Sequence, residues 1–124
     1  MTTKGRAETI EATCHCGAVT IQLPAAPQEI THCNCSLCRR LGVLWAYYEI
    51  AEAVLPAADS TDTYAWGGKN VDFHRCRTCG CLTHWYPRDK RRTGFGLNAR
   101  LLVPTLLEKA PKRYKDSAGT GLFH

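Results

Sequence analysis

The sequence lacks any long apolar run. No stretch of it approaches the roughly eighteen apolar residues that a membrane-spanning helix requires. Its beginning, MTTKGRAETIEA, is polar and charged, which is not typical of an export signal. We therefore expect a cytoplasmic protein without a membrane-bound part. A chain of 124 residues predicts one domain with a modest core.

Cysteine is absent from most of the chain, yet eight cysteines gather in three short clusters. These are CHC at 14–16, CNCSLC at 33–38 and CRTCGC at 76–81. Secreted disulfide scaffolds scatter their cysteines through loops, and the cytosol keeps thiols reduced. Cys-x-Cys and Cys-x-x-Cys pairs instead place two thiolates close enough to share one ion. The pattern favours bound zinc over disulfides or simple buried thiols.

Helical periodicity is also scarce, and the pattern predicts a mostly β fold. Alternating or branched and aromatic residues predict strands at 19–23, 43–50, 81–87 and 94–103. A hairpin is expected around GGKN at 67–70, and its return strand leads directly into Cys76. One short helical turn, capped by Ser36 or Asn34 and ended by Gly42, is expected after the middle cluster.

The end of the chain shows no clear periodicity. We therefore expect a zinc domain over residues 1–104 and a loose C-terminal tail over residues 105–124.

The first and third clusters together suit one closed zinc site. Structural zinc takes four ligands in a tetrahedron. Cys76 and Cys79 form a Cys-x-x-Cys pair, and Cys14 and Cys16 are its natural partners. Such a site would join distant parts of the chain and contribute folding free energy directly.

The middle cluster offers three thiols, Cys33, Cys35 and Cys38. Three protein ligands and one open position are typical of a catalytic zinc. A thiol that reached the open position would lose its proton, because the cation stabilises the thiolate. That thiolate could then add to the carbon of an aldehyde.

Four stretches resemble, in order and spacing, the family of glutathione-dependent formaldehyde-activating enzymes, which also includes centromere protein V. They are CHCGAV (14–19), CNCSLCRR (33–40), CRTCG (76–80) and LNARLL (97–102). The resemblance covers roughly residues 10–103. It implies a zinc-containing β-tent of small antiparallel sheets.

The resemblance also implies two zinc ions per chain. Cys14, Cys16, Cys76 and Cys79 would hold a structural zinc, and Cys33, Cys35 and Cys38 a more labile, catalytic one. The implied activity is that of a carbon–sulfur lyase, with glutathione as the co-substrate. Glutathione and formaldehyde would give S-hydroxymethylglutathione.

Arginines beside the clusters are candidates for substrate contacts. Arg39 and Arg40 follow Cys38, and Arg75 and Arg77 flank Cys76. Either pair could balance the negative charge of a thiolate cluster or bind a substrate carboxylate. Solvated surface arginines are the alternative.

Cys81 and the histidines leave alternatives open. Cys81 is either an ordinary buried cysteine or a fourth ligand that closes the second zinc site. Four histidines could ligate zinc or move a proton, but none is assigned a role. They are His15, His32, His74 and His84.

A net charge of +5 supports a rival hypothesis. The segment PRDKRRTG at 87–94 predicts a basic loop between two strands. In the rival account the chain is a non-catalytic zinc module that binds nucleic acid or a protein through this loop. In a third account the middle cluster is a metal or redox sensor.

Overall fold

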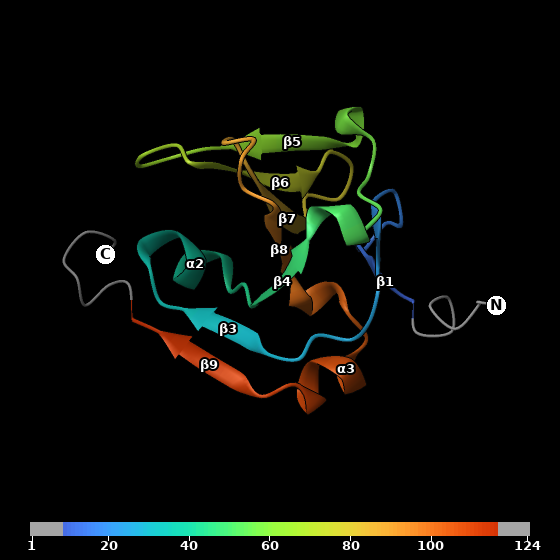
Figure 1. Ribbon diagram of the computed structural model, residues 1–124. Helices are drawn as coiled ribbons and strands as arrows, with labels where there is room; N and C mark the ends of the chain where they lie inside the picture. The colour runs from blue at the N-terminus through green and yellow to red at the C-terminus, as the bar shows by residue number, and fades with distance from the viewer. Residues whose placement is uncertain (1–8, 117–124) are drawn as a thin grey trace.

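Two β-sheets and two short helices make up the described part of the chain. The computed structural model describes residues 9–116 (Figure 1). The strands are β1 (Ile10–Thr13), β2 (Thr20–Leu23), β3 (Ile30–Cys33), β4 (Trp45–Glu49), β5 (Thr61–Tyr64), β6 (Val71–Cys76), β7 (Leu82–Pro87), β8 (Gly94–Asn98) and β9 (Lys112–Lys115). The helices are α2 (Ser36–Leu41) and α3 (Pro104–Lys109), with 3-10 turns η1 (Ile50–Glu52), η2 (Ala58–Ser60) and η3 (Ala99–Leu101). The predicted mostly β fold is confirmed.

The larger sheet has the strand order β5-β6-β7-β8-β4-β3-β9, and β1 pairs with β2 in a separate small sheet. Neighbouring strands are antiparallel except for the parallel pair β3–β9. The predicted hairpin is confirmed, because β5 and β6 pair with Tyr64 opposite Phe73. Gly67 lies in the connecting turn with a φ of 61°, which favours glycine.

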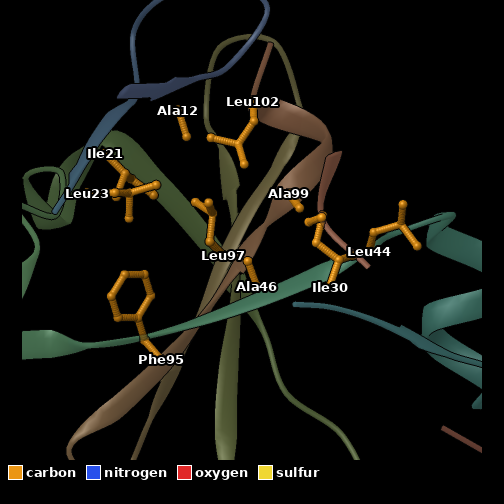
Figure 2. Packing of buried hydrophobic residues seen from close by; sticks show 11 residues of the cluster. Ala12, Ile21, Leu23, Ile30, Leu44, Ala46, Phe95, Leu97, Ala99 and Leu102 are labelled. Atoms are coloured by element: carbon orange, nitrogen blue, oxygen red, sulfur yellow. The ribbon is translucent and has the colours of Figure 1, made fainter. Parts of the chain in front are cut away.

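The two faces of the larger sheet pack against different groups of residues. Side chains alternate along β4, so Ala46 lies on one face and Trp45 on the other. Ala46 belongs to the main hydrophobic core, whereas Trp45 packs with the middle cysteine cluster. Figure 2 shows the core gathered around Leu97, with Ile21 and Leu23 of β2 on one side and Ile30 and Leu44 on the other. The fold thus places the middle cysteine cluster beside Trp45, on the face of β4 opposite the main core.

The prediction of a loose tail is wrong for residues 105–115. Pro104 begins α3, since proline is well suited to the first turn of a helix, and Leu106 and Leu107 pack against the core. β9 then pairs with β3 from Lys112 to Lys115. A six-residue helix is too short to show periodicity, and every side chain of β9 is exposed, so β9 shows no alternation. Residues 117–124 of the expected tail lie outside the described residues.

The helical turn after the middle cluster is present, but its cap differs from the prediction. The N-cap is Cys35, whose sulfur accepts a hydrogen bond from the Cys38 N–H at 3.3 Å. Neither Ser36 nor Asn34 has this role. The helix ends at Gly42, as predicted, with a φ of 67°. Neither α2 nor any other helix within residues 9–116 has the length and apolar character needed to cross a membrane.

Candidate metal centres

Four cysteines from both halves of the chain meet at one point. Cys14 and Cys16 lie in the turn after β1, and Cys76 ends β6, with Cys79 in the turn that follows. Their four sulfurs all lie within 4.8 Å of one another. The Cys14–Cys16 and Cys16–Cys76 sulfur distances are both 3.7 Å. A tetrahedron with zinc–sulfur distances of about 2.3 Å has edges of about 3.8 Å, so these sulfurs fit a zinc ion.

Backbone N–H groups surround this four-cysteine site. Val19 N–H donates to the Cys14 sulfur at 3.3 Å, and Ala18 N–H donates to the Cys16 sulfur at 3.4 Å. Backbone N–H groups, first that of Cys81 and then that of Cys16, lower the pKa of Cys79 to about 5. Such donors stabilise thiolates, the form that binds a metal.

Three further cysteines form a second, more buried group. Cys33 ends β3, Cys35 caps α2 and Cys38 lies within α2. The three sulfurs lie within 4.8 Å of one another, and all three residues are buried. Trp45 donates its indole N–H to the Cys38 sulfur at 3.3 Å. The arrangement suits one soft metal ion held by three thiolates.

Burial strongly affects the Cys38 thiol of this three-cysteine site. Desolvation raises the pKa of the Cys38 thiol, and the Trp45 hydrogen bond opposes this rise. A thiolate at this position therefore needs a neighbouring positive charge, which a bound dication supplies.

No fourth side chain completes this second group within residues 9–116. The group contains no histidine, carboxylate or further cysteine. Cys81 packs against the four-cysteine site instead, beside Cys14, Cys76 and Cys79. The interpretation of Cys81 as a fourth ligand of the second zinc is therefore not supported.

The described histidines, at 15, 32, 74 and 84, lie outside both cysteine groups. His74 and His84 stack with ring centroids 4.3 Å apart, between β6 and β7. Each ring Nδ1 lies 2.8 Å from a threonine hydroxyl, Thr61 for His74 and Thr83 for His84. Burial lowers the pKa of His84 to about 3. This pair, of which His84 is buried and His74 half-buried, is part of the packing between two strands.

The two arginines after Cys38 are exposed in the last turn of α2. Arg40 donates back along the helix to the Ser36 carbonyl at 2.9 Å. A substrate contact for Arg39 or Arg40 stays a prediction.

A wide groove of about 770 Å³ is lined by the segment before β3 and by residues of β4, β7 and β8. Tyr47 and Trp85 line it, with ring centroids 6.1 Å apart. Trp85 also packs against the group that contains Cys33, Cys35 and Cys38. Desolvation raises the pKa of Tyr47, and the nearby Cys33 and Cys38 raise it further. A hydrogen bond to Thr31 lowers this pKa and so opposes the rise. The groove therefore approaches the three-cysteine site through these two rings.

Gly96 makes room for Trp85. A Cβ atom at position 96 would overlap the indole ring of Trp85, which lies over the backbone of β8. The sequence pattern predicted core positions for the tryptophans and tyrosines and did not single out Trp45, Tyr47, Trp85 or Gly96 as residues of a site. For Gly96 the available signal was its place inside the predicted strand at 94–103, because a glycine within a strand often marks a close approach.

The comparisons with known proteins agree with this geometry. Residues 9–102 match the sequence model of the family described as glutathione-dependent formaldehyde-activating enzyme. The structure is similar to the crystal structure of a Rhodobacter sphaeroides protein, with a TM-score of 0.67 and 31% sequence identity. That alignment covers 84% of this chain and 100% of the other. The chain therefore belongs to the family of glutathione-dependent formaldehyde-activating enzymes.

Proposed function

We propose that this chain is a zinc-dependent carbon–sulfur lyase. It joins a glutathione-like thiol to a small aldehyde, or reverses that addition, at Cys33, Cys35 and Cys38. The observation that carries this proposal is the group of three buried sulfurs with no fourth protein ligand within residues 9–116. Family membership supports the same class of reaction.

Cys33, Cys35 and Cys38 would hold the second zinc ion. When bound, zinc supplies a positive charge that favours the thiolate form of an incoming thiol. In the addition, the thiol sulfur bonds to the carbonyl carbon, and the thiol proton ends on the former carbonyl oxygen. Trp45 fixes the Cys38 sulfur through its N–H, and the α2 backbone fixes the Cys35 sulfur.

The four-cysteine site would hold the first zinc, in a structural role, through Cys14, Cys16, Cys76 and Cys79. They connect the β1–β2 turn to the end of β6, which lie about sixty residues apart in the chain. In this proposal the first zinc stabilises the fold, and the second takes part in the reaction.

The groove supports a peptide thiol such as glutathione as the co-substrate. Its lining carries both signs of charge, with Glu29, Glu49 and Glu52 together with Arg91 and Arg92. A γ-glutamyl tripeptide likewise carries an ammonium group and carboxylates. Trp85 lines this groove, lies under Arg92 and packs against the three-cysteine site.

The basic loop gives less support to nucleic-acid binding. Arg88 donates to Asp72 at 2.8 Å, and Arg91 donates to Asp89 at 3.0 Å. Arg92 lies over the Trp85 ring, 5.7 Å from its centroid. These contacts neutralise or engage part of the charge that a phosphate backbone would need.

A Cys35→Ser variant tests the proposal, with Cys81→Ser as the matched control. Cys35→Ser should lose one of two zinc ions, keep its far-ultraviolet circular dichroism spectrum and lose activity with glutathione and formaldehyde by at least about 100-fold. Cys81→Ser should keep both zinc ions and the activity. An unchanged rate in Cys35→Ser would reject the proposal.

A further inference from the structure

A second recess lies against the three-cysteine site, between α2 and the sheet. This recess, called the hollow here, has a volume of about 300 Å³. It is lined by Leu37, Leu41, Tyr64, Phe73, Arg75, Gly80 and Leu82. It shares no lining residue with the groove. The three-cysteine site is thus flanked by two separate recesses.

Residues that line the hollow also pack against the three-cysteine site. Leu37, Phe73 and Leu82 line the hollow and pack against the group that contains the three cysteines. Leu37 directly precedes Cys38 in α2. Phe73 contacts Trp45, with ring centroids 6.1 Å apart, and Trp45 donates to the Cys38 sulfur. A molecule in the hollow would therefore lie beside the reacting centre.

The rim of the hollow exposes apolar surface. Leu41 is 43% exposed and Tyr64 is 53% exposed. Apolar surface gathered around a recess often marks a binding site. Formaldehyde has no carbon substituent that could use it. The hollow suits an aldehyde that carries an apolar chain.

Arg75 gives the hollow one positive charge. Asp62 lies directly opposite Arg75 on β5, so the two side chains would ordinarily pair across the strands. The Asp62 carboxylate instead accepts from Arg77 at 3.1 Å. Arg75 therefore has no carboxylate partner in the stretch from residue 9 to residue 116. A guanidinium at the edge of an apolar recess suits a ligand carboxylate.

We infer that the hollow binds the substituent of an aldehyde larger than formaldehyde, namely a short aliphatic chain that ends in a carboxylate. The aldehyde carbon lies at the three-cysteine site, the chain lies against Leu37, Phe73 and Leu82, and the carboxylate contacts Arg75. The thiol sulfur bonds to the aldehyde carbon, and its proton ends on the former carbonyl oxygen. This inference rests on the proposed function and names the second substrate of the same site.

The kinetic test uses the zinc-loaded full chain with glutathione and three aldehydes: formaldehyde, pentanal and 5-oxopentanoate. The kcat/KM value should be at least about tenfold higher for 5-oxopentanoate than for pentanal, because only the former has a carboxylate. Arg75→Gln should remove this difference between the two larger aldehydes. Arg88→Gln is the matched control, because Arg88 is exposed and pairs with Asp72 away from the hollow. It should leave all three rates unchanged.

A binding test separates this inference from the proposed function. Hexanoate, which has the chain and the carboxylate but no aldehyde, is titrated into isotope-labelled, zinc-loaded protein. The amide resonances of Leu37, Phe73 and Leu82 should shift, and Arg75→Gln should weaken the binding about tenfold or more.

The kinetic and binding results together distinguish failure of this inference from failure of the proposed function. If no aldehyde reacts but hexanoate binds through Arg75, the hollow is a carboxylate site and the lyase proposal fails. If formaldehyde reacts while hexanoate causes no shift and 5-oxopentanoate gains nothing over pentanal, the lyase proposal stands and this inference is overturned.

Discussion

Trp45 connects the sheet to the three-cysteine site through a single N–H group. It is buried in β4, and its indole donates to the Cys38 sulfur at 3.3 Å. Hydrogen bonds to metal-ligating groups orient the ligand and stabilise its charged form. This residue therefore contributes to the site without being a ligand.

A Trp45→Phe variant should weaken the second zinc site selectively. Phenylalanine keeps an aromatic ring beside Phe73 but has no N–H donor. We expect zinc at the three-cysteine site to be held about tenfold less tightly, while zinc at the four-cysteine site is unchanged. Competition with a chromophoric chelator measures both affinities. Equal affinities in the variant and the wild type would show that the hydrogen bond is unimportant.

Gly96 has a packing role that a second glycine of the same strand lacks. A Cβ at position 96 would overlap the Trp85 indole, whereas a Cβ at Gly94 would lie 3.5 Å from the Tyr48 carbonyl oxygen, an ordinary contact. Gly96→Ala should therefore cost about 1–3 kcal/mol of unfolding free energy. Gly94→Ala should cost little. Urea denaturation followed by fluorescence compares the two, and similar values would argue against the close approach of Trp85.

At the scale of elements, the sequence predicted strands where side chains alternate. β2, β4, β7 and β8 lie within the predicted ranges, and the β5–β6 hairpin closes near GGKN. Alternation fails as a signal for β9, whose side chains are all exposed. The cap of α2 was also missed, because propensity favours serine or asparagine while a cysteine sulfur accepts the N–H here.

The pair of strands β6 and β7 encloses a histidine whose protonation opposes folding. Burial lowers the pKa of His84 to about 3 from an ordinary value of 6.5. Between these values the unfolded chain binds a proton that the folded chain does not. The contribution to stability is therefore complete above pH 6.5 and is lost as the pH falls toward 3.

A His84→Gln variant isolates this contribution. Between pH 7.5 and pH 5 the wild type should lose about 2 kcal/mol of unfolding free energy that the variant does not lose. Contributions from the cysteines are common to both proteins and cancel in the difference. Denaturant unfolding at several pH values gives the two slopes. Parallel slopes would mean that His84 is protonated equally in the folded and unfolded chains.

At the scale of the whole molecule, the cysteine spacing carried the most information. Cys-x-Cys and Cys-x-x-Cys pairs predicted which sulfurs meet, and the structure gathers both groups as expected. The groove and the hollow could not be predicted, because they are lined by residues from several strands and loops. Their place beside the three-cysteine site depends on the order of strands in the larger sheet, which alternation alone does not specify.

Centrally, zinc at the four-cysteine site stabilises the fold, and zinc at the three-cysteine site keeps one coordination position open for substrate. Stepwise removal of zinc from the purified full chain by a chelator, followed together by elemental analysis and thermal unfolding, tests this claim most directly. We predict two zinc ions per chain. The first should leave with the melting temperature nearly unchanged, and the second should leave with a fall of at least about 10 °C. Protein that carries no zinc when purified, or a melting temperature unchanged after complete removal, would contradict the account.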